Sequence, residues 1–190
     1  MLQDLTITKG DDEMNFFDLV QKRESCRDYA DQKVEKEKLV SCIEAARLSP
    51  SACNSQPWSF IVINQDELSQ KVAKCTQNLG MNKFTDRCPA FIVVCQESAN
   101  TTAKIGGVVT NQQFAPIDIG LAAAHICYRA TELGLSTCIL GWFSEKKLKE
   151  LLSLPGSKHI RLILAVGYAN SDQIRAKKRK SLDDIMTYIG

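Results

Sequence analysis

Apolar positions along this chain follow two different periods, and the change of period marks the expected helices and strands. In VEKEKLVSCIEAARLS (34–49) they recur at the spacing of an α-helix. WSFIVIN (58–64) has the composition of a strand, and PAFIVVCQ (89–96) is a near-continuous apolar run, typical of a strand covered on both faces. HIRLILAVGYA (159–169) predicts a further, central strand.

Four other segments predict helices, at 14–22, 67–80, 117–134 and 145–154. The third is the longest and almost entirely apolar, so it is expected to be buried. Gly80 would end the second helix, and Ser144 is a suitable N-cap for the fourth. Residues 97–113 have no clear period, and we expect a loop there that is mobile or lines a site.

The order of these elements predicts the fold class. Strands interleave with helices, and there is no internal repeat or low-complexity tract, which indicates one α+β domain over residues 14–190. Residues 1–13 are polar and unpatterned, so we expect them to form a poorly ordered N-terminal extension.

Composition and charge narrow the classes of protein that remain. The chain has 190 residues, of which 44% are hydrophobic and 24% charged, as in ordinary globular proteins, and its formal charge of +2 does not by itself imply a polyanionic partner. No stretch approaches the roughly eighteen apolar residues of a membrane span. The N-terminus also lacks the pattern of a signal peptide. We therefore expect a cytoplasmic protein with no membrane partner.

Eight cysteines are spread along the chain without a C-x-x-C pair. Zinc and iron–sulfur sites use close pairs of thiolates, so a metal site is disfavoured. Several cysteines occupy small apolar positions within apolar patterns, as Cys42, Cys95 and Cys127 do. We therefore expect buried, reduced thiols and a reducing compartment.

Several catalytic motifs are missing from the sequence. It contains no G-x-G-x-x-G after a strand, no P-loop, no G-x-S-x-G and no H-E-x-x-H. Only two histidines occur; His125, in the middle of the longest predicted helix, is expected to be a hydrogen-bonded core or interface residue rather than a catalytic base. If the protein is an enzyme, a bound cofactor supplies its reactivity.

Candidate anion-binding residues occur near both ends of the chain. RESCR places Arg23, Ser25 and Arg27 on alternate positions, and in an extended segment their side chains would point the same way. Two guanidinium groups beside a hydroxyl would suit a phosphate, although a solvated surface run is an equal interpretation of this segment alone. The basic run RAKKRK (175–180) is either a solvated face or an RNA-binding patch; without interleaved aromatics we expect no nucleic-acid partner.

Taken in order, five blocks of this sequence resemble the FMN-dependent nitroreductase family. They are RESCRDY, ARLSPSACNSQPWSFIVI, GLSTCILGWF, LAVGYA and the basic tail before LDDIM. The P-S-A-x-N-S-Q-P-W core is the most specific of them, and the similarity runs from about Met14 to the C-terminus. The resemblance implies a three-layer α+β fold with a mixed, mainly antiparallel central sheet flanked by helices. It also implies an interlocked homodimer with FMN at the interface.

The same resemblance assigns roles to individual residues. Arg23 and Ser25 would contact the FMN phosphate together with Lys177 and Arg179 from the tail, and Arg27 would reach the pyrimidine edge of the flavin. The polar loop would contact the FMN held mainly by the other subunit through Pro50, Ser51, Ala52, Asn54 and Gln56. The backbone of Leu140 and Gly141 would face flavin N5 and O4. Many relatives carry Ser in place of Ala52, and Cys53 is unusual there: we expect a small filler, with an oxidation-sensitive thiol as the alternative.

The implied activity is electron transfer from NAD(P)H through FMN to a nitroaromatic, a quinone or a related acceptor, by a ping-pong mechanism. No side-chain acid or base is required, because FMN N5 carries the chemistry. One alternative in the same fold is reductive dehalogenation of a halotyrosine-like substrate, against which the short segment 97–113 argues, because such enzymes need a lid. Another is a non-catalytic flavin-binding or redox-sensing protein, with Cys53 or Cys138 as the sensor.

Overall fold

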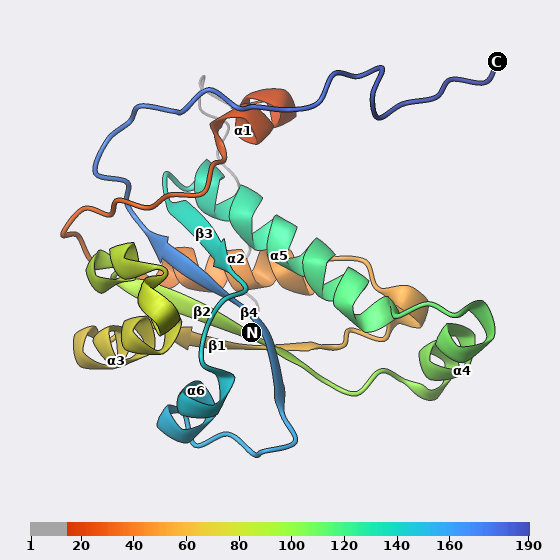
Figure 1. Cartoon of the computed structure of the whole chain (residues 1–190), viewed down its shortest axis with the longest axis horizontal. Coiled ribbons are helices and arrows are strands. Elements are labelled where there is room, and N and C mark those ends of the chain that lie inside the picture. The colour runs from red at the N-terminus through yellow and green to blue at the C-terminus, as the bar shows by residue number, and fades with distance from the viewer. Residues whose placement is uncertain (1–14) are drawn as a thin grey trace, which may run out of the picture.

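The computed structural model describes residues 15–190 (Figure 1). The predicted extension 1–13 and Met14, the start of the first predicted helix, lie outside the described residues. The α-helices are α1 (Phe16–Lys22), α2 (Lys36–Arg47), α3 (Asp66–Thr76), α4 (Thr101–Thr110), α5 (Phe114–Glu132) and α6 (Glu145–Leu151). The strands are β1 (Trp58–Ile63), β2 (Ala90–Gln96), β3 (Ser136–Leu140) and β4 (His159–Gly167). Short 3-10 helices lie at Ala52–Asn54, Asn78–Gly80 and Lys83–Arg87.

The four strands form one sheet in the order β1-β2-β4-β3, and every neighbouring pair of strands is antiparallel. β2 and β4 are the inner strands, and all but the last residue of β2 are buried, as its continuous apolar run predicts. The prediction of a central strand at 159–169 is confirmed. β3 was not expected, because no strand was predicted between the helices at 117–134 and 145–154.

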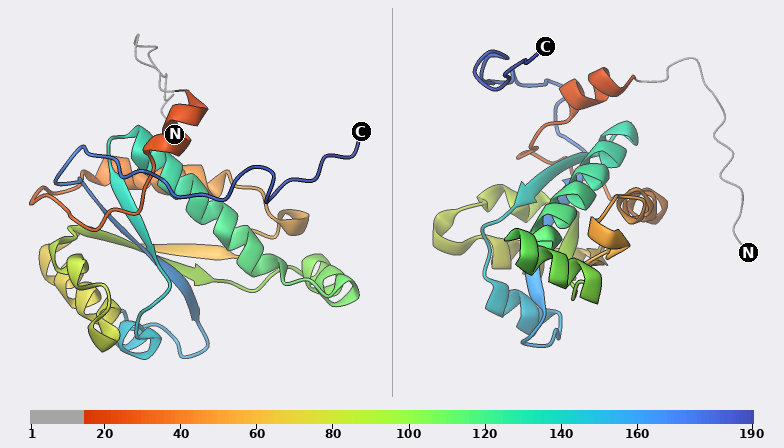
Figure 2. Two further views of the ribbon diagram at one scale, coloured as in Figure 1. Left: turned by 45° about the horizontal axis from the view of Figure 1, so that its top comes forward. Right: turned by 90° about the vertical axis from the view of Figure 1, so that its right-hand side faces the viewer.

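Helices cover both faces of the sheet, and Figure 2 shows the resulting layers. On one face α3 and α6 pack against alternate sheet residues such as Phe91 and Ile163. On the other face α2 and α5 pack against the intervening residues, such as Ile92 and Leu164. The alternation follows from the pleat, which points successive side chains to opposite faces. The predicted three-layer fold with a mainly antiparallel sheet is confirmed, with one isolated parallel bridge between Ser25 and Thr137.

The segment expected to be a loop at 97–113 contains helix α4, so that prediction is wrong. Asn100 is the N-cap of the helix, and its side-chain oxygen accepts a hydrogen bond from the N–H of Ala103 at 2.8 Å. Asn111 ends the helix in the left-handed conformation, with φ 51°. Gly106, Gly107 and several threonines have low helix propensity and hide the period, whereas asparagine at both ends is the signal that was available.

Other helices differ from the prediction at their ends. α5 begins at Phe114, ahead of the predicted residue 117, because Pro116 suits a first helical turn. Only one face of α5 is buried, since Ile117 and Leu121 are 53% and 41% exposed, so the prediction of complete burial is wrong. α3 ends at Thr76 rather than at Gly80, because the chain turns through a left-handed Leu79.

The N-terminal segment after α1 lies along the ends of β3 and β4. Tyr29 is buried and donates a hydrogen bond to the Ala165 carbonyl at 3.2 Å. A Cβ on Gly167 would stand 2.8 Å from the ring carbons of both Tyr29 and Pro89, so no larger residue fits there. This close approach fixes the segment that leads back to the predicted phosphate-binding residues. No helix of residues 15–190 is long and apolar enough to cross a membrane.

Candidate functional site

The predicted cradle RESCR runs in an extended conformation beside β3. Its register is set by the Cys26 N–H, which donates to the Thr137 carbonyl at 2.9 Å, and by the bridge between Ser25 and Thr137. Arg27 is exposed close to Cys138: burial raises the pKa of that thiol, and the Arg27 charge opposes the rise. Ser25 is partly buried between the two arginines.

The C-terminal tail returns to this segment, as Figure 1 shows where the tail passes α1. Arg175 donates from Nε to the Glu24 carboxylate at 3.0 Å and from Nη2 to the Ser25 carbonyl at 2.6 Å. Lys177 donates from Nζ to the Arg23 carbonyl at 2.6 Å and to the Gln21 carbonyl, which places a cation at the C-terminal end of α1. These contacts bring the two predicted halves of the phosphate site together within one chain.

Three predicted cations form a cluster at this junction. Partial burial lowers the pKa of the Lys177 ammonium, and the charges of Arg23 and Arg179 lower it further. The Arg179 guanidinium is exposed and donates to the neighbouring Lys178 carbonyl at 2.7 Å. We refer to these three residues as the cation cluster Arg23–Lys177–Arg179. Cations that repel one another at a partly buried position are stabilised by an anion, so the cluster suits a phosphate.

The sequence analysis missed Glu24 and Arg175, which join the tail to the cradle. Both residues stood inside segments that it had selected, Glu24 between two predicted cradle residues and Arg175 at the start of the basic run. Their pairing spans 151 residues of sequence, and no local pattern predicts a contact at that separation.

The loop that carries Pro50, Ser51, Ala52, Asn54 and Gln56 is held by its own polar groups. The Ser51 hydroxyl accepts from the Gln56 N–H at 3.0 Å, and Gln56 Nε2 donates to Asn54 Oδ1 at 3.1 Å. Cys53, Asn54 and Gln56 have φ values of 52°, 49° and 46°, a region that costs energy for residues with a side chain. Asn54 and Gln56 are exposed, so the loop presents these polar side chains on the surface; Pro50 is also exposed, and Ala52 is partly buried.

Two residues that the sequence analysis did not single out anchor this loop. Asp118 of α5 is buried, and its two carboxylate oxygens each lie 3.2 Å from the Ala52 nitrogen, whose N–H they accept. Asn100, the N-cap of α4, donates from its side chain to the Cys53 carbonyl at 3.0 Å and from its backbone to the Ser55 hydroxyl at 2.8 Å. An acid within the apolar N-terminal half of the helix, the first of its two acids, was the available signal for Asp118.

Within one chain the loop and the cation cluster lie at different ends of α5. The loop is bound at Asp118, near the start of the helix, whereas the opposite end carries α1, whose Phe16 ring lies 5.9 Å from that of Tyr128. Arg23 also lies near this end of the helix, where its charge opposes the rise that burial causes in the pKa of the Cys127 thiol. Ten residues of helix separate Asp118 from Tyr128, or roughly 15 Å. The structure therefore does not bring these two groups of predicted residues together in one protomer.

The third predicted segment follows β3. Leu140 is buried at the end of the strand, where it pairs with Ile163. Gly141 is exposed, and a Cβ built on it would have no neighbour within 4 Å, so local packing does not require glycine at this position. The next residue, Trp142, accepts a hydrogen bond from Asn82 Nδ2 at its carbonyl, at 3.0 Å. This contact fixes the backbone just after the predicted flavin-facing residues.

The cysteines divide into two groups. Seven are buried, as predicted, and burial raises the pKa of both Cys42 and Cys88 to about 12. Cys53 is the exception to the expected burial, because it is exposed on the loop. Cys138, one of the two candidate sensor thiols, is buried. His125 makes a 2.8 Å hydrogen bond through Nδ1 with the Leu121 carbonyl of its own helix, which confirms a hydrogen-bonded residue.

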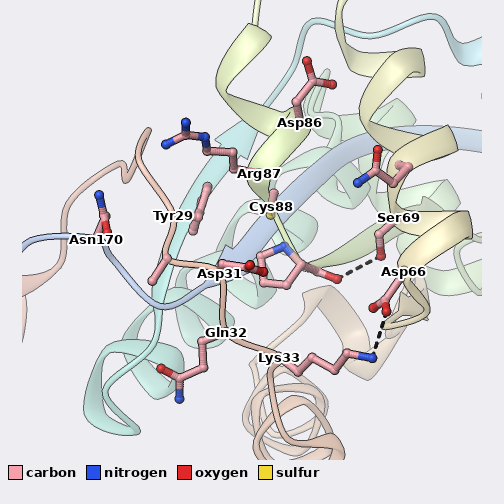
Figure 3. A pocket seen from close by; sticks show the side chains of 13 residues that line it. Tyr29, Asp31, Gln32, Lys33, Asp66, Ser69, Asp86, Arg87, Cys88 and Asn170 are labelled. Carbon is pink, nitrogen blue, oxygen red and sulfur yellow. Dashed lines mark hydrogen bonds and ion pairs between the residues drawn. The ribbon is translucent and has the colours of Figure 1, made fainter.

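A separate cavity of about 550 Å³ lies between the segment that follows the cradle and α3 (Figure 3). Lys33 and Asp66 form an ion pair of 2.8 Å at its edge, and the Ser69 hydroxyl donates to the Pro89 carbonyl at 2.9 Å. None of the predicted cofactor residues lines this cavity.

Comparison with known proteins identifies the family. The model of the Nitroreductase family matches residues 20–79 and 70–168 of this chain. A putative NADH dehydrogenase/NAD(P)H nitroreductase of Archaeoglobus fulgidus is 27% identical over 159 residues, covering 82% of this chain and 86% of the relative. Iodotyrosine deiodinase 1 of Mus musculus is 23% identical over 203 residues, covering 92% of this chain and 69% of the relative. The solved structure of an FMN-dependent nitroreductase from Clostridium difficile R20291 is 28% identical, with a TM-score of 0.67, and the match covers 88% of this chain and 92% of that one. The chain described here belongs to the nitroreductase family.

Proposed function

We propose that this protein is an FMN-dependent oxidoreductase that takes electrons from NAD(P)H and passes them to a nitroaromatic, a quinone or a related acceptor by a ping-pong mechanism. The observation that carries the proposal is the cation cluster Arg23–Lys177–Arg179, formed where the two ends of a nitroreductase-family chain meet. The similarity to an NAD(P)H nitroreductase and to an FMN-dependent nitroreductase supports the donor and the cofactor.

The residues present fit an FMN molecule. Its phosphate would lie at the cation cluster, where burial and the charges of Arg23 and Arg179 lower the pKa of Lys177 and Glu24 only partly offsets them. Bound FMN supplies the redox chemistry, because its ring takes a hydride from the donor and returns electrons to the acceptor. Arg27 would hold a fixed positive charge near the ring and stabilise the negative charge that reduction places there. Backbone N–H groups at Leu140 and Gly141 would orient the ring.

We propose further that a second copy of the chain completes the site. Within one protomer the cation cluster and the loop lie toward different ends of α5, roughly 15 Å apart along its axis, and we infer that a partner supplies the loop that meets the cofactor. Exposed apolar side chains support such an interface. They lie on α5, at Ile117 and Leu121, and along the tail, at Leu182, Ile185 and Ile189.

The test begins with the visible spectrum of the purified protein, which we expect to show bound flavin that bleaches under anaerobic NADH or NADPH. The double variant R23A/R179A removes two charged contacts worth roughly 1.5–3 kcal/mol each, so FMN should bind at least about tenfold more weakly. The control variant K178A/K180A also removes two positive charges, both from the tail, and should retain FMN. Protein that stays colourless when FMN is supplied refutes the proposal.

Reductive dehalogenation of a halotyrosine-like substrate is the second candidate function. The deiodinase relative supports it, as does α4, a helix in the segment where the sequence had indicated no lid. Release of halide from a halotyrosine under reducing conditions, faster than reduction of a nitroaromatic by the same preparation, would favour this candidate. Nitroaromatic turnover without halide release would reject it.

A further inference from the structure

An open groove of about 630 Å³ lies between α4 and the first turn of α5. Its polar lining consists of two cations, Lys104 and Arg161, and side-chain amides such as that of Gln96, and it contains no acidic residue. Its apolar lining includes Val108, Phe114 and Pro116. A cavity with positive charge, amide donors and an aromatic wall is complementary to a molecule that has both an apolar ring and an acidic group.

The two cations of this groove are available for a ligand. Within residues 15–190 neither Lys104 nor Arg161 forms an ion pair, and the one hydrogen bond of the Arg161 side chain runs from Nε to Gln96 Oε1, at 2.5 Å. That bond orients the guanidinium plane, because Gln96 belongs to β2, the strand paired with the β4 strand that carries Arg161. In the cavity of Figure 3, by contrast, Lys33 is already paired with Asp66.

The groove adjoins the loop that we place against the flavin. Asn100, the N-cap of α4, binds the Cys53 carbonyl and the Ser55 hydroxyl. Asp118, two residues beyond the groove residue Pro116 in α5, accepts the Ala52 N–H. A molecule seated between the two helices therefore lies beside the supports of that loop.

Resting on the proposed function, we propose that this groove binds the electron acceptor and that the acceptor class is an aromatic carboxylate. Lys104 and Arg161 bind the carboxylate, and Phe114 and Val108 contact the ring. The sequence indicated that residues 97–113 are mobile or line a site, but it did not indicate this groove, because α4 was not predicted. With a nitro substituent on the ring, NAD(P)H supplies a hydride while solvent supplies a proton, and the nitro group becomes a nitroso group with release of water.

The experiment compares 4-nitrobenzoate with 4-nitrobenzamide, which has a ring of the same size and no charge. Isothermal titration of the oxidised FMN-loaded protein, with no reductant present, gives each affinity without turnover. We expect the carboxylate to bind about fivefold more tightly or better. Lys104→Gln and Arg161→Gln should each weaken carboxylate binding about threefold and raise its KM with little change in kcat, because partly exposed ion pairs contribute little individually. Binding of the amide should stay constant.

Lys71→Gln is the matched control, because Lys71 is an exposed lysine of α3 that does not line the groove. Equal affinity for carboxylate and amide in the wild-type protein overturns the proposal, and so does a carboxylate affinity that neither groove variant changes. A protein that binds FMN and accepts electrons from NAD(P)H but shows either result refutes the acceptor class alone. Failure to bind FMN instead refutes the proposed function.

Discussion

Replacing Arg175 with alanine tests whether the tail must be fastened for the cation cluster to bind a phosphate. The change removes the 3.0 Å contact with Glu24 and the 2.6 Å contact with the Ser25 carbonyl, so the attachment of the tail to the cradle is weakened. The backbone N–H of residue 175, which donates to Glu24, and the Lys177 contacts remain. Arg175 itself is outside the cluster, so its effect would be one of position.

The magnitude follows from the exposure of the two side chains. Hydrogen bonds to charged groups contribute roughly 1.5–3 kcal/mol when protected from water. Arg175 is 57% exposed and Glu24 25%, so solvent screening reduces the loss to about 1 kcal/mol. A loss of that size weakens FMN binding about fivefold. Riboflavin has no phosphate and should bind R175A and the wild-type protein equally.

Flavin fluorescence quenching measures both affinities on the same preparations. K178A is the charge-matched control, because no contact of the Lys178 side chain with residues 21–25 is seen, and it should bind FMN like the wild-type protein. R175K, which retains the charge but lacks the guanidinium fork that reaches both Glu24 and the Ser25 carbonyl, should recover part of the loss. An R175A variant that loses riboflavin as strongly as FMN would show that Arg175 supports the fold in general, and our reasoning about the cluster would be wrong.

Three further outcomes are expected. Only Cys53 should react rapidly with a thiol reagent at pH 8, since a pKa of about 12 leaves roughly one Cys88 thiol in ten thousand ionised; rapid labelling of C53S would contradict this. Hydrogen bonds from Lys158 and a serine lower the pKa of Glu97, so E97Q should destabilise the fold by about 0.5 kcal/mol at pH 7 in urea unfolding, an effect that disappears as pH falls through that lowered pKa. Asp118→Ala should lower the free energy of unfolding by about 1–3 kcal/mol and Tm by several degrees, because the Ala52 N–H loses its acceptor. Amide exchange in the loop should become faster, and an unchanged Tm and exchange rate would refute the role of Asp118 as an anchor.

The elements that the sequence predicted well are those whose burial pattern is long and simple. The continuous apolar run of β2 and the helical spacing in α2 both follow directly from being covered by neighbours. β3 was missed because a five-residue strand offers few positions for a period, and α4 because its glycines and threonines obscure the helical pattern.

The site was predictable as a set of segments and not as a set of contacts. RESCR and the basic tail were both selected from the sequence, but the pairing of Glu24 with Arg175 depends on how distant segments meet. The role of Asp118 is similar, since only the fold shows that its carboxylate reaches Ala52. Candidate binding residues can be recognised in the sequence, whereas the residues that position them can be recognised only in the folded structure.

The meeting of residue 23 with residue 177 has a consequence for the order in which this molecule is made. A growing polypeptide on the ribosome already contains the first guanidinium and the polar loop while the cations of the tail have yet to be translated. If FMN binds at the cation cluster as we propose, it cannot serve as a nucleus for folding before the tail is made, because β4, the last strand of the sheet, ends at Gly167, ahead of Lys177.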